Sequence, residues 1–366
     1  MLEDIFLAAQ KKGIFPGAAT AIFQGRGTER KKLIKCYGNT AYQGDDLTPV
    51  GPATFYDLAS LTKPLATLPA LLTLLTAGRI KMEDKLGELL QRDLPREKRD
   101  ICLRQLLGHS AGLAAHIPFF NHRPGPPPPE RRDEVRESIL AEILAQPLIY
   151  PPGSATVYSD LGYILAGMIV EIKSGEDLAS FVRKNVYEPL GLSDQLFFNG
   201  ANHHHPAGYA PGEFCAWRQR ILHGEVGDEN CALLGGVAGH AGLFGNIGGV
   251  ASLAAYLLDL WQGRAAVELL DPEELRRCFS RQRINSDTTW ALGVDTPSRQ
   301  GSSGGHLLSP ESIGHLGYSG TSFWIDPRRE LVVVLLSNRV HPSRYNDQIK
   351  KFRPLFHDTV IRLLED

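Results

Sequence analysis

The sequence predicts an α+β protein in which one antiparallel sheet is built from both chain ends, is flanked by helices, and carries an inserted, mainly helical region. Two observations predict this class. Strand signals, with aromatic and β-branched residues, occupy residues 16–58 and return at 321–337. Between them, residues 60–195 show the apolar spacing of helices. A sheet shared by the two ends would pair these widely separated strands.

The N-terminal part of the chain carries the first of these strands. Residues 7–10 can form a helix that leads into them. Strands with turns between them are then expected at residues 18–24, 32–37 and 54–58.

Six apolar segments follow at helical spacing. They predict helices near residues 65–77, 83–91, 101–107, 132–146, 159–173 and 176–187. Proline is tolerated in the first turn of a helix, so Pro64 places the helix start close to Ser60. Pro69 predicts either a kink or a helix that becomes regular only from that point.

The C-terminal part returns to strands after a long irregular stretch. Residues 196–245 are rich in glycine and histidine without periodicity, which is typical of loops near a functional surface. A helix is expected at 250–261. Strands at 321–325 and 331–337, joined by Asp-Pro-Arg-Arg-Glu, predict a hairpin. Residues 345–365 can close the fold as a helix.

This order of elements predicts two units with the active site between them. The first is a discontinuous α/β sheet domain of residues 1–58 and 240–366. The second is a helical region of residues 59–239, which ends in a long loop over 196–239.

Composition limits the partners that the chain can have. It has 366 residues, of which 43% are hydrophobic and 22% charged, as in ordinary soluble domains. A net charge of −2 offers no electrostatic reason to expect nucleic acid. The longest apolar stretches, residues 68–75 and 331–336, are too short to span a bilayer. We expect a small-molecule or short peptide substrate and no membrane span.

The chain is expected to be cytoplasmic. Residues 1–6 are acidic and lead into no apolar core of a signal peptide. Five cysteines are an odd number without regular spacing, so reduced thiols fit better than a disulfide framework. They are Cys36, Cys102, Cys215, Cys231 and Cys278.

The pair Ser60 and Lys63 is the strongest candidate for chemistry. Positions i and i+3 share one face of a helix, so the two side chains can meet where a strand-like segment gives way to a helical run. The positive end of the helix dipole favours a developing alkoxide on Ser60, and a lysine desolvated enough to be neutral can take its proton. A helix cap is the alternative role for Ser60.

A rival nucleophile lies in the segment Gly108-His109-Ser110-Ala111-Gly112. It matches G-x-S-x-G, the nucleophile elbow of α/β-hydrolases. That elbow needs a buried strand before it and a helix after it. Residues 101–107 read better as a short helix, so a tight glycine-bounded turn is the favoured interpretation of this segment.

Two further segments contain polar groups that can serve Ser60. Tyr158-Ser159-Asp160 opens an apolar helix that Ser159 or Asp160 can cap. Tyr158 beside a cationic lysine can have a lowered pKa and act as a base. Residues 314–321 are glycine-rich and enter a strand. A backbone N–H there can pair with the N–H of Ser60 as an oxyanion hole, although a plain glycine-rich strand edge also fits.

A metal site is the remaining alternative from the residues alone. His203, His204 and His205 are adjacent, with His223, Cys215 and Cys231 nearby in sequence. Adjacent histidines cannot all face one ion on regular structure, and the segment lacks the spacing of known zinc sites. We therefore expect no metal.

These motifs, taken in order, resemble the serine hydrolases of the class C β-lactamase and penicillin-binding-protein superfamily. Ser60-x-x-Lys63, Tyr158-Ser159-Asp160 and His315-x-Gly317 are similar to its three active-site motifs. The likeness runs from about residue 5 to residue 360. It also includes the segments at residues 107–113, 152–153, 189–192, 238–244 and 335–342.

The resemblance implies a fold and a set of roles. The fold would be β-lactamase/transpeptidase-like. Ser60 would be acylated, Lys63 would orient and deprotonate it, and Tyr158 would act as partner base and proton donor. The N–H groups of Ser60 and Tyr318 would form the oxyanion hole. The residues that contact substrate would be Asp160, His315 and Gly317. The long loop resembles loops that border the family's site, so its segment Asp228-Glu229-Asn230 would border the pocket.

The implied reaction is acyl transfer through an acyl-enzyme, followed by hydrolysis of an ester, amide or β-lactam carbonyl, with no metal or organic cofactor. Two alternatives stay open. The chain could be a D-alanyl-D-alanine carboxypeptidase or a penicillin-binding protein with slow deacylation, or it could be a short-chain carboxylesterase.

Two residues depart from the family pattern. Asp160 replaces the asparagine of Tyr-x-Asn, exchanging an amide donor for a carboxylate that can stabilise a charged Lys63. His315 replaces a lysine, so a permanent charge becomes one expected to titrate near neutrality and to hold a substrate carboxylate less firmly at pH 8 than at pH 6. We expect poor β-lactam turnover and better cleavage of short acyl esters or D-amino-acid amides.

Overall fold

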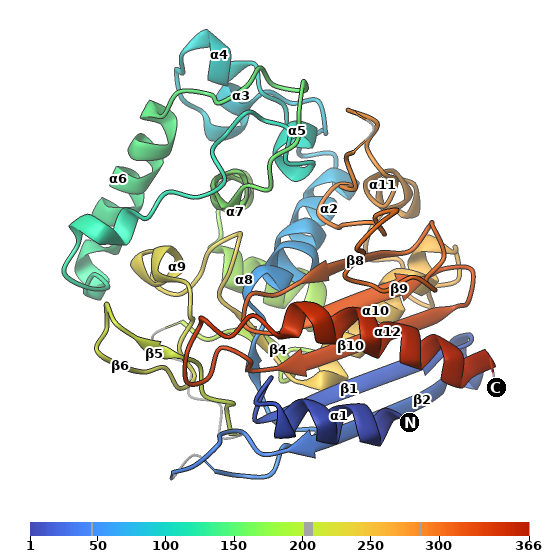
Figure 1. The fold of residues 1–366 in the computed structure, drawn as a ribbon. Helices are drawn as coiled ribbons and strands as arrows, with labels where there is room; N and C mark the ends of the chain where they lie inside the picture. The colour runs from blue at the N-terminus through green and yellow to red at the C-terminus, as the bar shows by residue number, and fades with distance from the viewer. Residues whose placement is uncertain (45–46, 201–207, 286, 366) are drawn as a thin grey trace.

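A five-stranded antiparallel sheet joins the two ends of the chain (Figure 1). The computed structural model describes the chain except at residues 45–46, 201–207, 286 and 366. The strand order is β2-β1-β10-β9-β8, so the first and last strands of the chain pair at its centre. The strands are β1 Gly17–Gln24, β2 Lys31–Gly38, β8 Ile313–Leu316, β9 Ser322–Asp326 and β10 Leu331–Ser337.

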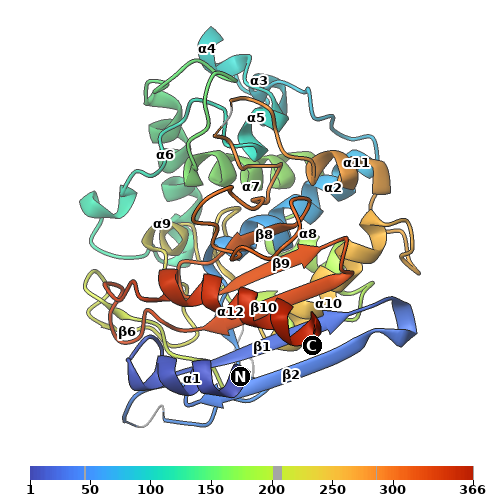
Figure 2. The same cartoon turned by 45° about the vertical axis from the view of Figure 1, so that its right-hand side comes forward.

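Helices cover both faces of this sheet, so β1, β9 and β10 are buried, whereas the edge strand β2 is largely exposed. The α1 helix (Leu2–Lys11) and the α12 helix (Ile349–Glu365) lie side by side on one face, and α10 (Ile247–Trp261) packs on the other (Figures 1 and 2). Every residue of β10 is buried, and alternate side chains enter the two cores. This explains why the strand is a continuous apolar run.

The inserted region is mainly helical and lies above the sheet in Figure 1. Its central helix, α7, is buried continuously from Leu161 to Val170, so the other helices pack around it. The helices outside the sheet layers are α2 Leu68–Thr76, α3 Leu86–Leu90, α4 Arg96–Arg99, α5 Leu103–Leu107, α6 Arg132–Ala145, α7 Asp160–Ser174, α8 Leu178–Val182, α9 Glu229–Leu233 and α11 Pro272–Cys278.

Short helical turns complete the fold. Those in 3-10 geometry are η1 Gly27–Glu29, η2 Ala59–Leu61, η4 Phe119–His122 and η5 Pro129–Arg131. Two segments are π-helical. The first, η3 Lys63–Thr67, overlaps the start of the helix predicted at 65–77, and the second, η6 Arg183–Tyr187, forms the end of the helix predicted at 176–187. Pro69 has no N–H to donate, and the regular α2 helix begins beside it at Leu68, as the sequence predicted.

The predicted α+β class and the sheet built from both chain ends are confirmed, while two local predictions are wrong. The segment 54–58 forms only β3 (Tyr56–Asp57), which lies in a separate sheet with β7 (Leu243–Gly245) and β4 (Leu196–Phe198). The loop predicted at 196–239 contains β4, the α9 helix and a small hairpin. That hairpin consists of β5 Phe214–Cys215 and β6 Arg220–Ile221.

The short strands escaped prediction because two or three residues have no measurable periodicity and are held by tertiary pairing. The α9 helix has only five residues, which is also too short for a periodic pattern. The division into residues 1–58 with 240–366 and 59–239 stays a prediction.

A close approach between two glycines fixes the inserted region against the chain near residue 240. A Cβ on Gly239 would lie 2.7 Å from the backbone nitrogen of Gly167 in α7 and would also collide with the Tyr163 carbonyl. Thr67 donates its hydroxyl to the Gly239 carbonyl at 2.6 Å. This contact therefore holds residues 239–241 beside η3.

We predict that Gly239→Ala lowers the free energy of unfolding by about 1–3 kcal/mol, because the backbone of α7 cannot yield to the added methyl group. Urea denaturation measures the loss. Gly125→Ala is the control, since a Cβ there meets nothing within 4 Å. Equal stability of the two variants would contradict this close packing.

Candidate active site

Ser60 lies on a strained turn that precedes the first helix of the inserted region. Ala59 has φ 49°, in the left-handed region that alanine rarely adopts. The Asp57 carboxylate accepts the Ala59 N–H at 2.8 Å and, through its other oxygen, the Gly227 N–H at 2.7 Å. Thr62 donates its hydroxyl to the Ala59 carbonyl at 2.6 Å. The residue before Ser60 is therefore held on both sides.

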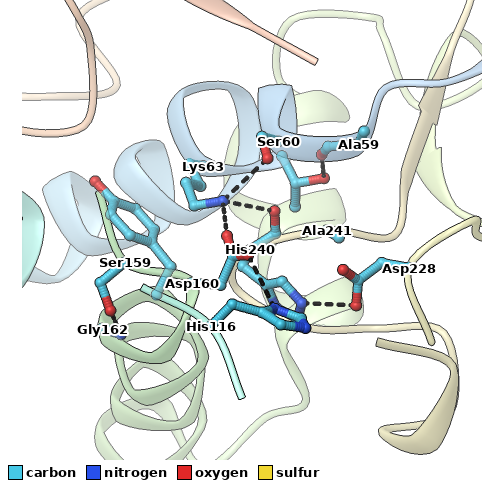
Figure 3. Close-up of polar contacts among 12 residues, drawn as sticks. Ala59, Ser60, Lys63, His116, Ser159, Asp160, Gly162, Asp228, His240 and Ala241 are labelled. Carbon is cyan, nitrogen blue, oxygen red and sulfur yellow. Dashed lines mark hydrogen bonds and ion pairs between the residues drawn. The ribbon is translucent and has the colours of Figure 1, made fainter. Parts of the chain in front are cut away.

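Lys63 is fully buried and its ammonium group has three hydrogen-bond acceptors (Figure 3). Its Nζ donates to Ser60 Oγ at 3.2 Å, to Asp160 Oδ1 at 2.7 Å and to the His240 carbonyl at 3.2 Å. Burial lowers the pKa of Lys63, but Asp160 and Tyr158 raise it by a larger amount, so the net pKa lies above its usual value. Lys63 is thus a cation in the resting site.

Asp160 is the first residue of α7, where the positive end of the helix favours a carboxylate. Ser159 caps this helix by accepting the Gly162 N–H at 3.3 Å. Burial raises the pKa of Asp160, but Lys63 and His116 outweigh it and hold that pKa well below its usual range. His116 Nδ1 lies 3.6 Å from Asp160 Oδ2, and this contact raises the pKa of His116.

Tyr158 stands beside Lys63, whose Nζ is 4.8 Å from the centre of its ring. Burial raises the pKa of Tyr158 by more than the charge of Lys63 and the hydrogen bonds to Lys63 and Ser60 lower it, so the phenol is neutral. The predicted lowering of this pKa is therefore wrong. Trp290 stacks on the Tyr158 ring at 5.2 Å and His109 contacts it at 4.7 Å.

His315 is buried at the end of β8 and does not reach the cavity described below. Its Nδ1 lies 2.8 Å from the Leu316 carbonyl. Burial, with the charge of Lys63, lowers the pKa of His315 to about 3, so the ring is neutral across the physiological range. The prediction that His315 titrates near neutrality is wrong, because it assumed an exposed side chain.

Gly317 brings the end of β8 against the Ser60 turn. A Cβ on Gly317 would lie 2.6 Å from the Leu58 carbonyl, so only glycine fits. The following residue, Tyr318, lines the same cavity as Ser60, and its side chain is 57% exposed. No acceptor among the described residues binds the Tyr318 N–H.

A cavity of about 350 Å³ opens beside Ser60, and its wall is acidic. The carboxylates that line it are Asp57, Asp160, Glu213, Glu225, Asp228 and Glu229. Among the described lining residues Arg344 is the one arginine, and it is paired with Glu213 and Glu229. The other basic residues of the described lining, His116 and His240, likewise lie against Asp160 and Asp228, so none of these basic groups is free to bind a substrate carboxylate. The wall therefore favours a neutral or cationic group.

The loop residues predicted to border the pocket do so in part. Asp228 and Glu229 line the cavity, whereas Asn230 is buried and donates to the Ile117 carbonyl at 2.8 Å. Asp228 also contacts the His240 ring, whose Nε2 lies 2.9 Å from Asp228 Oδ1 (Figure 3). This pair orients the residue whose carbonyl binds Lys63.

Ser110 is excluded as an elbow nucleophile. The α5 helix precedes it where an elbow needs a strand, and the Ser110 side chain is buried. Its N–H donates to the Gln105 carbonyl at 2.8 Å. The neighbouring His109 accepts the Ser159 N–H on Nδ1 at 3.1 Å, so this segment supports the chain beside Tyr158.

Sequence reasoning did not identify His116, Trp290 or Asp57 as parts of the site. No short pattern surrounds His116 or Trp290, and Asp57 could have been found only from its position three residues before Ser60.

Within the described part of the chain, no three His, Cys, Asp or Glu side chains are grouped so that they could hold a metal ion. His203, His204 and His205 lie outside the described residues. No described helix has the length and apolar character needed to cross a bilayer.

Comparison with solved structures identifies the class of this fold. Simvastatin synthase (LovD) from Aspergillus terreus aligns with a TM-score of 0.72 at 20% identity, covering 99% of this chain and 97% of that one. EstCE1, a hydrolase with promiscuous acyltransferase activity, aligns with a TM-score of 0.70 at 20% identity, covering 96% and 97%. The fold is β-lactamase/transpeptidase-like, as the sequence predicted.

Sequence relatives define the family. Residues 2–354 match the family described as Beta-lactamase. A protein of Escherichia coli K12, provisionally named a D-alanyl-D-alanine carboxypeptidase, is 33% identical over 308 residues, which is 79% of this chain and 70% of the relative. A Salmonella agona protein of the same name is 32% identical over 316 residues, or 81% and 72%. The chain belongs to the β-lactamase family, and the prediction of a β-lactamase-related serine hydrolase is confirmed.

We predict that Asp57→Ala lowers the free energy of unfolding by about 2 kcal/mol, because the Ala59 and Gly227 N–H groups lose their acceptors. Chemical denaturation measures this loss. Asp57→Asn keeps one acceptor oxygen and should lose less. If Asp57→Ala were as stable as the unmodified protein, the carboxylate would not be what holds the Ser60 turn.

Proposed function

We propose that Ser60 is the acylated nucleophile of this hydrolase, with Lys63 and Tyr158 carrying its proton. The observation that carries the proposal is the 3.2 Å hydrogen bond from Lys63 Nζ to Ser60 Oγ at the wall of the cavity. Tyr158 also lines that cavity and bonds to both residues, so a proton has a continuous path.

The proposed cycle begins when Lys63 loses one proton. Neutral Lys63 then accepts the proton of Ser60 as Oγ bonds to the substrate carbonyl carbon. Tyr158 donates its proton to the leaving group and regains one from Lys63, and the leaving group departs from the tetrahedral intermediate. A water molecule then attacks the acyl carbon and gives one proton to Lys63. That proton passes to Ser60 Oγ as the acid leaves, which restores the free enzyme. The N–H groups of Ser60 and Tyr318 would bind the oxyanion in both halves.

The substrate is proposed to be a small ester or amide whose bound part carries no free carboxylate. The acidic cavity wall supports this, since its one described arginine, Arg344, is already paired with two glutamates. His315 is neutral and offers no charge to a carboxylate. A D-alanyl-D-alanine carboxypeptidase is the second candidate, supported by the names of the curated relatives. Rapid nitrocefin hydrolysis would contradict the proposed preference.

The proposed compartment and partners are those predicted from the sequence. Five free cysteines, four of them buried, support a reducing and therefore cytoplasmic compartment. The net charge of −2 supports the absence of a nucleic-acid partner.

We predict that Ser60→Ala abolishes covalent labelling by a fluorophosphonate or a penicillin, because the nucleophilic oxygen is gone. Intact-mass spectrometry detects the adduct. Ser110→Ala is the matched control and should label normally. Loss of labelling in Ser110→Ala alone would overturn the assignment.

The charge of Lys63 makes a prediction about pH. Since Lys63 must lose a proton before it can accept one, and its pKa is raised, kcat/KM for p-nitrophenyl acetate should climb with pH on the alkaline side. Asp160→Asn removes the carboxylate that raises this pKa most and leaves only Tyr158 to oppose burial, so the rising limb should move to lower pH by about 1 unit or more.

A pH profile of kcat/KM measures that shift. Asp228→Asn is the control, because Asp228 bonds to the His240 ring and not to Lys63, and its limb should move less. A limb that stays in place or moves to higher pH in Asp160→Asn would contradict the role of Asp160.

A further inference from the structure

We propose that Arg353 is a positioning residue that fixes and polarises the Gly317–Tyr318 peptide, so that the Tyr318 N–H faces Ser60 as an oxyanion donor. This inference rests on the proposed function of Ser60. It adds to the site a side chain from α12, the C-terminal helix, which covers the face of the sheet opposite to α10.

The hydrogen bonds of Arg353 set the direction of that peptide. Arg353 is buried, and its Nη2 donates to the Gly317 carbonyl and to the Thr321 carbonyl, each at 2.7 Å. The C=O and N–H of a trans peptide point in opposite directions. Holding the Gly317 oxygen toward α12 therefore turns the Tyr318 N–H away from that helix, and Tyr318 lies at the wall of the Ser60 cavity.

Besides Arg353, one backbone hydrogen bond holds the Gly317–Tyr318 peptide. Gly317 must be glycine for close packing, so it has no side chain that limits rotation of the peptide after it. The turn is closed by Gly317 N–H to the Thr321 carbonyl at 2.7 Å and by Gly320 N–H to the Gly317 carbonyl at 3.1 Å. Arg353 therefore shares the Gly317 oxygen with one backbone donor, and its own bond is the shorter. Arg339 holds the next peptide by donating to the Tyr318 carbonyl at 2.8 Å. Arg353 holds the preceding peptide, which carries the Tyr318 N–H, by donating to the Gly317 carbonyl.

Arg353 is also an unusual cation to bury. No carboxylate among the described residues pairs with it, and its Nε has no acceptor there. Burial and the charge of Arg339 lower the pKa of Arg353 to about 9, and the guanidinium stays charged at neutral pH. A buried cation without a counter-ion is costly, so a role for its charge would explain its presence.

That charge lies behind the carbonyl of the donor peptide. A cation bonded to a peptide oxygen draws electron density toward it and strengthens the N–H of the same peptide as a donor. The charge of Arg353 is felt in the site, since it helps to lower the pKa of His315. It would thus stabilise the negative oxygen that develops at Ser60 during acylation.

The test compares Arg353→Met with Arg30→Met. The side chain of Arg30, just before β2, is only 5% exposed and pairs with Asp259, so Arg30 serves as the matched control. For a p-nitrophenyl ester, Arg353→Met should lower kcat by about 10- to 100-fold with little change in KM. Affinity for a boronic acid, whose serine adduct is tetrahedral and anionic, should fall by a similar factor. Arg30→Met should keep both.

A structural role alone would lower stability in both variants and leave kcat and the boronic acid affinity of Arg353→Met unchanged, which would overturn the proposal. Arg353→Lys keeps the charge without the planar fork and should lose less than Arg353→Met. If Arg353→Met does not fold, an Arg353→Lys variant with unchanged kcat and unchanged boronic acid affinity would likewise overturn it.

Failure of the proposed function would look different. If the unmodified protein neither turns over esters nor labels at Ser60, the chemistry proposed above is wrong. The orientation of the Gly317–Tyr318 peptide is then tested by a crystal structure of Arg353→Met or Arg353→Lys. A rotated Gly317–Tyr318 peptide supports the positioning role, and an unchanged peptide overturns it.

Discussion

The buried ammonium of Lys63 is the interaction on which the rest of the site depends. A cation without water is stable only when its donors are satisfied, and here the three acceptors come from parts of the chain far apart in sequence. Ser60 comes from the turn before η3, Asp160 from the start of α7, and His240 from the loop packed against α7. Folding that brings these together also assembles the site.

The supporting contacts around this ammonium explain several otherwise odd local features. Ala59 is held in a left-handed conformation because Asp57 and Thr62 bind its two backbone groups. Gly239 has no side chain because the loop that presents the His240 carbonyl touches α7. The resting site therefore holds a Lys63–Asp160 ion pair beside a neutral Tyr158, and its base must be generated by losing a proton from that arrangement.

Sequence patterns predicted much of this structure where the signal was local. The limits of β10 were predicted to the residue because an apolar run there ends at polar residues, and Ser60, Lys63, Tyr158 and Asp160 do meet. Burial depends on tertiary packing that no short motif encodes, so the neutral state of His315 was missed. Arg353 was missed for the same reason, since its importance lies in two carbonyls more than thirty residues away.

The most direct test of the central claim is a crystal structure of the protein after reaction with a phosphonate ester. We predict a phosphorus atom bonded to Ser60 Oγ, one phosphonyl oxygen between the N–H groups of Ser60 and Tyr318, and Lys63 still bonded to Asp160. An adduct on any other residue, or a phosphonyl oxygen turned away from both N–H groups, would contradict it.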